Sequence, residues 1–479
     1  MLFNSIEFAI FLPLIFVLYW FIFPKNRKAQ NLLLVGASYM FYGWWDWRFL
    51  GLILFSSILD FFAGKFIESS KRPKLRKAAL SISLIGNLGL LATFKYYDFF
   101  ILSLQDSLSV LGVAINLRTL NLILPVGISF YTFQTMSYSI DVYRRKMNAT
   151  KSLVDFMAFV SFFPQLVAGP IERASSLLPQ FGRERVFYYS NFSKGAALIL
   201  WGLFKKIVIA DNAAIYVNQI FDNYELYQGI TLFIGAFLFA FQIYCDFSGY
   251  SDIAIGTALL FGFELMRNFD YPYFSSSISA FWRRWHISLS SWFRDYLYIP
   301  LGGSRGSGFK RQRNISLVFI VSGIWHGANW TFFIWGMLHA IYYQLSSIRI
   351  DNRLKRHFMR LPQKGKEMFG ILKTFFVVTI AWIFFRAPTI SEALDYVRLL
   401  FFKGWFFDLH VPTPKAQFAY TIVLLIGFII FEWCSRNKEF PLELSMYSWK
   451  VRWSIYYIVF LLIITFGFYG ENEFIYFAF

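Results

Sequence analysis

Two histidines stand out among the residues whose types could support chemistry. His326 lies near the start of "VSGIWHGANWTFFIWG" (321–336), a run in which every other residue is apolar, aromatic or uncharged. Ionisable groups in such surroundings are costly, so each of them is a candidate functional residue. A buried imidazole is neutral at pH 7, which is the form that a general base needs. We therefore expect His326 to be a catalytic base, the alternative being a histidine that only hydrogen-bonds to a neighbouring helix.

His286 is the second histidine of interest. It lies in "FWRRWHISLSSWFRDY" (281–296), close to Arg283 and Arg284. The chain between His286 and His326 is long enough to bring the two imidazoles together. The sequence therefore predicts that His286 shares a site with His326, the alternative being an ordinary histidine at the membrane boundary.

Two further polar residues follow His326 in the same run. Asn329 is a possible polar partner of His326. His339 is less promising, because in a continuous helix it would lie about 20 Å from His326 and on a different face. We therefore expect His339 to be structural, unless Gly327 or Gly336 breaks the helix.

Carboxylates also occur in otherwise apolar sequence. Asp246 and Asp252 lie in "YCDFSGYSDIAIG" (244–256) and could line a polar cavity or pair with Lys205 and Lys206. The sequence contains neither an HExxH nor a CxxC pattern, so we expect no catalytic metal.

The composition indicates the elements that must position these residues. Of the 479 residues, 57% are hydrophobic and only 15% are charged, whereas soluble domains have about 25% charged residues. Apolar runs of about 18 residues or more recur along the chain, as in polytopic helical membrane proteins. Open sheets cannot span lipid, because their unpaired backbone groups would be unsatisfied. We therefore predict an all-α, multi-pass membrane protein.

The net charge of +18 does not indicate nucleic-acid binding. The lysines and arginines lie in short clusters between apolar runs, including the run at 349–360, as is typical of cytoplasmic loops. We predict a single domain over 1–479 with about 11–13 membrane helices, together with interfacial or re-entrant helices. Within it, 278–314 is expected to lie along the cytoplasmic face, and 315–347 to carry the catalytic histidine. The predicted spans are 6–23, 31–47, 49–66, 78–94, 121–141, 153–170, 194–213, 227–247, 250–265, 315–347, 367–386, 416–434 and 453–469.

Several long motifs follow one another in a characteristic order along the chain. They are "LPVGISFYTFQ" (124–134), "FFPQLVAGPIER" (162–173), "YCDFSGYSDIAIG" (244–256), "FWRRWHISLSSWFRDYLYIPLGGSR" (281–305) and "SGIWHGANWTFFIWGMLHA" (322–340). With these motifs the chain resembles the membrane-bound O-acyltransferase family, and within it the bacterial branch that O-acetylates polysaccharides such as alginate. The resemblance covers most of the chain, from the first helix past residue 390.

The resemblance implies a bundle of helices around a central tunnel. It assigns the essential histidine of the family to His326 and a second polar position to His286. It also implies an enzyme of the bacterial inner membrane that takes an acyl group from a cytosolic thioester and delivers it to a hydroxyl. In this branch the acetyl group passes outward to a cell-surface polysaccharide, usually with a separate periplasmic partner that resembles acyl hydrolases.

The implied donor is acetyl-coenzyme A or an acyl-carrier thioester, used as a substrate rather than as a bound cofactor. Its phosphates would need cations near the cytoplasmic mouth, and its carbonyl would need a hydrogen-bond donor in the transition state. Asn329 or His286 could be that donor, and the candidate cations are Arg283, Arg284, Lys205, Lys206 and the basic loop "SRGSGFKRQR" (304–313).

Two other functions stay open on the sequence. One remains within the family and changes the cargo to D-alanine or another acyl group for a cell-wall polymer. The other is a transporter of a lipid or sugar that uses the buried polar groups as its pathway. The chain has no evident internal repeat and no pair of Gly/Pro-broken helices in matching halves, which counts against the transporter.

Overall fold

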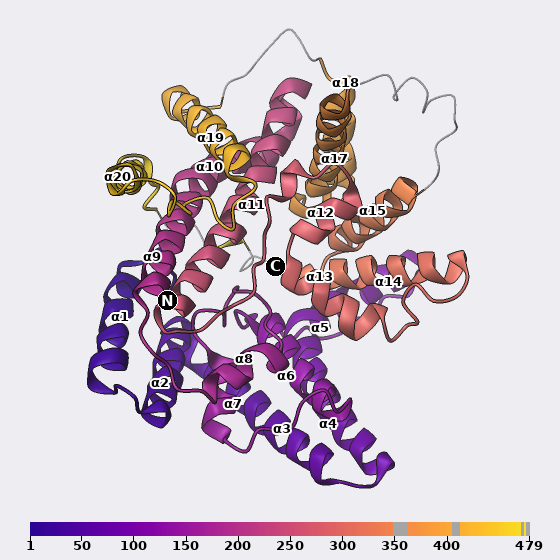
Figure 1. Ribbon diagram of the computed structural model, residues 1–479. Coiled ribbons are helices and arrows are strands. Elements are labelled where there is room, and N and C mark those ends of the chain that lie inside the picture. The colour runs from indigo at the N-terminus through magenta and orange to yellow at the C-terminus, as the bar shows by residue number, and fades with distance from the viewer. Residues whose placement is uncertain (348–361, 405–411, 471–473, 476–479) are drawn as a thin grey trace. The chain divides into compact units, whose positions relative to one another are not determined.

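Helices make up all of the regular structure described for this chain. The computed structural model describes residues 1–347, 362–404, 412–470 and 474–475, and no strand occurs among them (Figure 1). The prediction of an all-α protein is thereby confirmed. The basic run at 349–360, expected to be a cytoplasmic loop, lies outside the described residues.

Two compact units can be distinguished along the chain. The first comprises Met1–Ile199 and Tyr250–Met266, and the second comprises Leu200–Gly249 and Arg267–Phe479. The single domain expected over 1–479 stays a prediction. Both histidines singled out by the sequence belong to the second unit.

Six described helical segments are long and apolar enough to cross a membrane. This number is smaller than the 11–13 membrane elements expected, partly because neighbouring predicted spans merge. The spans expected at 31–47 and 49–66, for example, both fall within the 43-residue segment Arg27–Ser69. The six segments are Arg27–Ser69, Pro73–Val110, Gly229–Leu260, Gln363–Arg386, Lys415–Ser435 and Trp449–Phe466.

Helices of the first unit surround a buried carboxylate, Asp60 on α3. Ser139 donates a hydrogen bond to Asp60 Oδ1 (2.7 Å), Asn87 donates to Oδ2 (2.6 Å), and Ser83 also donates to Oδ1. These hydrogen bonds replace the water that a buried carboxylate would otherwise require. The partners of Asp60 lie on α4 and α6. The helices that lie wholly in the first unit are α1 (Ile6–Val17), η1 (Leu18–Ile22), α2 (Arg27–Asp46), η2 (Trp47–Phe49), α3 (Leu50–Ser69), α4 (Pro73–Leu91), η3 (Ala92–Tyr96), α5 (Tyr97–Val110), α6 (Ile128–Tyr143), α7 (Leu153–Ser161) and α8 (Ala174–Phe181).

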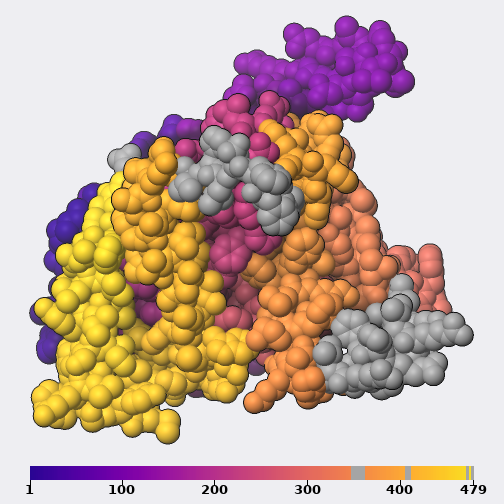
Figure 2. Space-filling model, turned by 90° about the horizontal axis from the view of Figure 1, so that it is seen from above, coloured from indigo at the N-terminus to yellow at the C-terminus, as the bar shows by residue number. Residues whose placement is uncertain are grey.

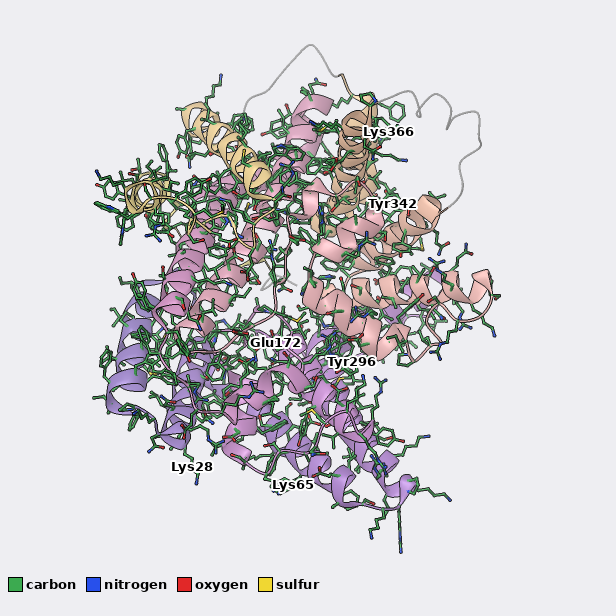
Figure 3. The ribbon with its side chains drawn as sticks, in the orientation of Figure 1. Lys28, Lys65, Glu172, Tyr296, Tyr342 and Lys366 are labelled. Carbon is green, nitrogen blue, oxygen red and sulfur yellow. The ribbon has the colours of Figure 1, made fainter. Side chains whose placement is uncertain are left out.

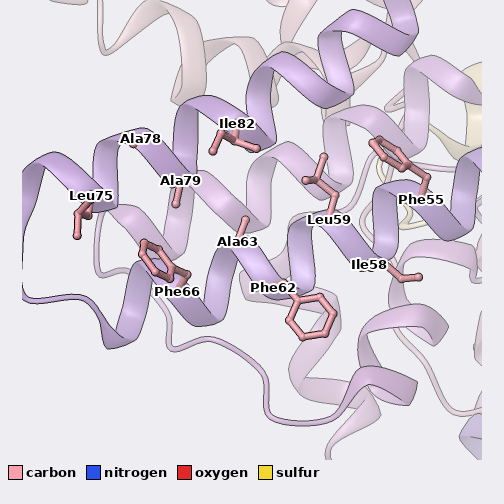
Figure 4. A pocket seen from close by; sticks show the side chains of 10 residues that line it. All are labelled: Phe55, Ile58, Leu59, Phe62, Ala63, Phe66, Leu75, Ala78, Ala79 and Ile82. Atoms are coloured by element: carbon pink, nitrogen blue, oxygen red, sulfur yellow. The ribbon is translucent and has the colours of Figure 1, made fainter.

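A groove of about 650 Å³ lies between α3 and α4 (Figure 4). Both helices belong to segments that are long and apolar enough to cross a membrane, and every lining side chain is apolar. An apolar groove on such helices is what contact with lipid chains favours. The lining residues are Phe55, Ile58, Leu59, Phe62, Ala63, Phe66, Leu75, Ala78, Ala79 and Ile82.

The second unit contains both His286 and His326. One of its helices, α20, exposes Trp449, Trp453 and Phe460. The C-terminal part of the chain is yellow in the space-filling view (Figure 2). Two helices, α9 (Tyr189–Leu203) and α11 (Gly229–Leu260), contribute residues to both units. The others are η4 (Phe204–Ala210), α10 (Asp211–Asp222), η5 (Tyr224–Leu226), η6 (Pro272–Phe274), α12 (Ile278–Arg284), α13 (Ile287–Phe293), η7 (Arg294–Tyr298), α14 (Gly308–His326), α15 (Trp330–Ser347), α17 (Gln363–Arg386), α18 (Ile390–Phe402), α19 (Lys415–Ser435) and α20 (Trp449–Phe466).

Candidate active site

The run that contains His326 folds as a hairpin of two helices. Helix α14 ends at His326, Gly327 is extended, and α15 begins at Trp330. The Phe332 ring lies so close to Gly327 that any side chain there would collide with it. Of the alternatives left open by the sequence, the break at Gly327 is the one observed: the chain reverses after His326, and no continuous helix runs from His326 to His339.

Two glycines let the helices of this hairpin touch through their backbones. A Cβ atom on Gly323 would collide with the Phe332 carbonyl oxygen, and one on Gly336 would collide with that of Phe319. Small residues at such crossings are the usual way for membrane helices to approach closely. The crossing fixes the end of α14, and so the position of His326, against α15.

Aromatic rings enclose His326, which is 3% exposed. Ring centroids of Trp325, Trp335 and Phe385 lie 5.0, 5.1 and 5.3 Å from that of His326. Trp330, at the start of α15, is 49% exposed and does not form part of this enclosure. Trp335 reaches His326 because the reversal at Gly327 turns α15 back along α14, and Phe385 comes from α17.

His286 lies at the turn between α12 and α13, and its own backbone is left-handed (φ 43°, ψ 56°). Backbone hydrogen bonds on both sides hold the turn: Ile287 donates to the Asn268 carbonyl (2.9 Å), and Asp270 donates to that of Arg284 (2.9 Å). The Asn268 side chain also accepts from the Ser288 hydroxyl (2.6 Å). A strained conformation persists only where its surroundings determine it in this way.

The structure brings His286 and His326 together. Their ring centroids are 6.3 Å apart. The Phe247 ring packs perpendicular to that of His286, with 4.7 Å between the two ring centroids. His286 is 1% exposed, and burial lowers the pKa of its imidazole to about 3, so it is neutral at pH 7. Two imidazoles in an aromatic enclosure can exchange protons with a substrate hydroxyl while bulk water is excluded. Their catalytic roles stay predictions.

Lys205 and Lys206, predicted to contact the donor, are both buried in η4. The Lys206 ammonium lies between two carboxylates, 2.8 Å from Asp211 and 2.7 Å from Asp246. Lys205 donates to the Ser248 hydroxyl (2.9 Å). The ion pair between Lys206 and Asp246 confirms one of the alternatives that the sequence left open for Asp246. Because two carboxylates already neutralise Lys206, its charge contributes to a buried polar cluster.

Arg283 and Arg284, the other predicted cations, lie at the end of α12. Arg283 donates to the Ser279 hydroxyl (2.9 Å), and the Arg284 side chain, 41% exposed, lies 4.0 Å from Asp270. Neither arginine is among the residues that line the cavity described below. Their contact with a donor stays a prediction.

Asn329 caps α15. Its side-chain oxygen accepts from the Thr331 amide (3.0 Å), and its side-chain nitrogen donates to the Pro388 carbonyl (2.8 Å). Side-chain caps of this kind stabilise a helix start. Its predicted role toward the donor carbonyl stays a prediction.

A cavity of about 270 Å³ lies between α14 and the segment α12–η7. Arg311, Ile315, Phe319 and Ser322 line it from one face of α14, and His326 continues that face one turn beyond Ser322. From Arg311 to His326 the helix rises about 22 Å. The lining residues are Trp282, Leu289, Ser290, Phe293, Arg294, Tyr298, Ser304, Arg311, Ile315, Val318, Phe319, Ser322 and Tyr343.

The cavity is basic at one end of α14 and apolar along its length. Arg294 and Arg311 belong to it, and Arg294 is partly neutralised by Asp295 at 2.7 Å. The sequence did not single out Arg294, whereas Arg311 lies in the basic loop 304–313 that was among the candidate cations. Among the described residues, no three His, Cys, Asp or Glu side chains are grouped to hold a metal ion.

Comparisons with known proteins identify the family. A sequence model of the membrane-bound O-acyltransferase family matches residues 45–387. A probable alginate O-acetylase from Azotobacter vinelandii is 40% identical over 85% of this chain and 79% of its own length. A peptidoglycan O-acetyltransferase from Helicobacter pylori is 34% identical over 94% of this chain and 92% of its own length.

A more distant relative differs in its acyl group. A teichoic acid D-alanyltransferase from Streptococcus thermophilus is 27% identical over 54% of this chain and 68% of its own length. The two histidines and the cavity beside them all lie within the span that the family model matches. The chain belongs to the membrane-bound O-acyltransferase family.

Proposed function

We propose that this chain transfers an acetyl group from a cytosolic thioester to a hydroxyl of a cell-surface polysaccharide. The observation that carries the proposal is the pair of buried imidazoles, His286 and His326, 6.3 Å apart in an aromatic enclosure. Relatives named for O-acetylation of alginate and of peptidoglycan align over most of the chain and favour acetyl as the cargo. The D-alanyl relative aligns over about half of it.

The reaction needs one base and one site for developing charge. His326 removes the proton of the acceptor hydroxyl as its oxygen attacks the thioester carbonyl. The C–O bond forms, the C–S bond breaks, and His326 returns the proton to the departing thiolate. His286, with its neutral ring, donates a hydrogen bond to the carbonyl oxygen as negative charge develops there. The enclosing rings limit loss of the thioester to water.

The donor occupies the cavity along α14 in this proposal. Phosphate groups of acetyl-coenzyme A or of a carrier-linked arm contact Arg311 and Arg294, and the arm runs over the apolar face towards His326. Because the cavity follows α14 for several turns, it suits the long chain that carries the acetyl group in such a donor better than an acetyl group alone. The enzyme is proposed to lie in the bacterial inner membrane and to pass the acetyl group to a periplasmic, acyl-hydrolase-like partner or directly to the polymer.

The test uses purified protein in liposomes with acetyl-coenzyme A labelled in the acetyl group. Wild type should consume the donor and label an added polysaccharide or partner, and His326→Ala should lose the activity. Trp330→Phe, at an exposed neighbouring position, is the matched control for folding. Equal activity in wild type and His326→Ala contradicts the proposed base. Labelling from a D-alanyl carrier but not from acetyl donors contradicts the proposed cargo, and sugar or lipid movement without acyl transfer supports a transporter.

A further inference from the structure

A third histidine, His339 on α15, is fully buried beside the candidate active site. Its ring lies 4.9 Å from Trp335 and 4.9 Å from Trp282, and 6.1 Å from Tyr342, which is labelled on the same helix in Figure 3. Trp335 in turn lies 5.1 Å from His326. The Trp335 ring therefore contacts both His339 and the proposed base.

His339 has one hydrogen bond among the described residues. Its Nδ1 accepts from the indole nitrogen of Trp282 at 3.2 Å. An accepting Nδ1 carries no proton, so the neutral ring carries its proton on Nε2. Nε2 has no hydrogen-bond partner in the described part of the chain. The hydrogen bond from Trp282 is thus the polar contact that this buried imidazole makes among the described residues.

Trp282 forms part of the wall of the cavity along α14. It lies on α12, and its ring packs at 5.2 Å against Phe319 and at 5.8 Å against Trp335. Phe319 lines the same cavity and lies on the face of α14 that leads to His326. The orientation of the Trp282 indole therefore sets the shape of the cavity next to the base.

The geometry points to His339 as a positioning residue. By accepting the Trp282 N–H, it holds the indole edge-on to Phe319 and Trp335 and keeps the cavity open for the donor. This inference rests on the proposed function, since it assigns a substrate to the cavity. A phenylalanine or leucine would fill the same apolar space without holding the indole nitrogen, so packing alone does not account for a histidine here.

The test compares kinetic constants of wild type, three single variants and one double variant with acetyl-coenzyme A as donor. His339→Leu and Trp282→Phe each remove one partner of the hydrogen bond, and His339→Asn keeps an acceptor near the position of Nδ1. Loss of the bond should raise KM for the donor about tenfold and change kcat less than threefold. His339→Asn should restore most of the loss. The double variant should be no worse than either single variant, because both remove the same bond.

Several outcomes overturn the inference. His339→Leu with unchanged KM and a kcat as low as that of His326→Ala makes His339 part of the chemistry. Additive effects in the double variant, or a folded His339→Asn that rescues nothing, make its role one of packing. If His339→Leu or Trp282→Phe does not fold, ultraviolet resonance Raman spectra of the indole N–H in wild type and in folded His339→Asn give a second measurement. A wild-type spectrum in which the Trp282 N–H is not hydrogen-bonded contradicts the bond to His339. Failure of the proposed function is distinguishable, because it leaves His326→Ala as active as wild type.

Discussion

Replacing Gly323 by alanine should lower kcat about a hundredfold while the protein stays folded. A methyl group at this position would collide with the backbone oxygen of Phe332 and would lie 3.3 Å from Gly336 Cα. Backbone atoms cannot rotate away as a side chain can, so α14 and α15 must separate on the scale of an ångström. His326 ends α14 one turn later, and a misplacement of about 1 Å at a reacting group can cost about 10²-fold in rate.

The stability cost of the same substitution should be moderate. Overpacking of a tight contact typically costs about 1–3 kcal/mol, less than the total stability of most domains. The assay measures acetyl transfer at saturating acetyl-coenzyme A, together with thermal unfolding in detergent. Gly427→Ala, on α19 where no neighbouring heavy atom lies within 4 Å of the new methyl group, is the control and should keep both activity and stability.

Two results would refute the reasoning about this helix crossing. Gly323→Ala with at least a third of wild-type kcat would show that the position of His326 does not depend on the contact between α14 and α15. A loss of activity only in proportion to unfolded protein would show that the glycine serves stability rather than placement.

Three further predictions concern buried charge, pH and the cavity mouth. Lys206→Met should destabilise the protein by about 3–5 kcal/mol, because it leaves two buried carboxylates without their cation, and Asp246→Asn should cost less; denaturation in detergent measures both. The pKa of His286 is near 6.5 in the unfolded chain and about 3 in the folded protein, so below pH 6.5 the unfolded chain takes up a proton that the folded protein does not. The free energy of unfolding should therefore fall by about 2 kcal/mol between neutral pH and pH 5. Thermal unfolding at pH 7 and pH 5 measures this loss, which should be absent from His286→Gln. Arg311→Gln should raise KM for acetyl-coenzyme A tenfold or more and should make that KM less dependent on salt concentration. The control Arg398→Gln, on α18 outside the cavity, should change neither. The same KM in Arg311→Gln and wild type would show that the donor phosphates do not contact Arg311.

The sequence predicted the fold class and the pair of histidines well, for physical reasons. Long apolar runs with few charges allow only helices in lipid, so the all-α class followed from composition. His326 and His286 were conspicuous because ionisable groups are rare in apolar and interfacial segments. The expected count of membrane elements was higher than the six long apolar helices described, because adjacent apolar runs merge into one helical segment such as Arg27–Ser69.

The walls of the site could not be predicted from sequence. A glycine in an apolar run does not by itself mark a break or a crossing, so the sequence left a break at Gly327 or Gly336 open and did not predict the approach of Trp335. Phe385 comes from a helix about 60 positions after His326 along the chain, and nothing local in the sequence indicates that contact. For Lys206 the sequence left open pairing with Asp246 and contact with the donor; the burial of the π-helix η4 and the second partner, Asp211, appear only in the structure.

The most direct test of the central claim is a single-turnover measurement of acetyl transfer by His326→Gln. Glutamine keeps much of the size and polarity of the imidazole but cannot act as a base at neutral pH. Loss of a general base should slow transfer by about 10²–10⁴-fold, with donor binding unchanged in equilibrium dialysis. Transfer at the wild-type rate by a folded His326→Gln would contradict the assignment of His326 as the base of this acyltransferase.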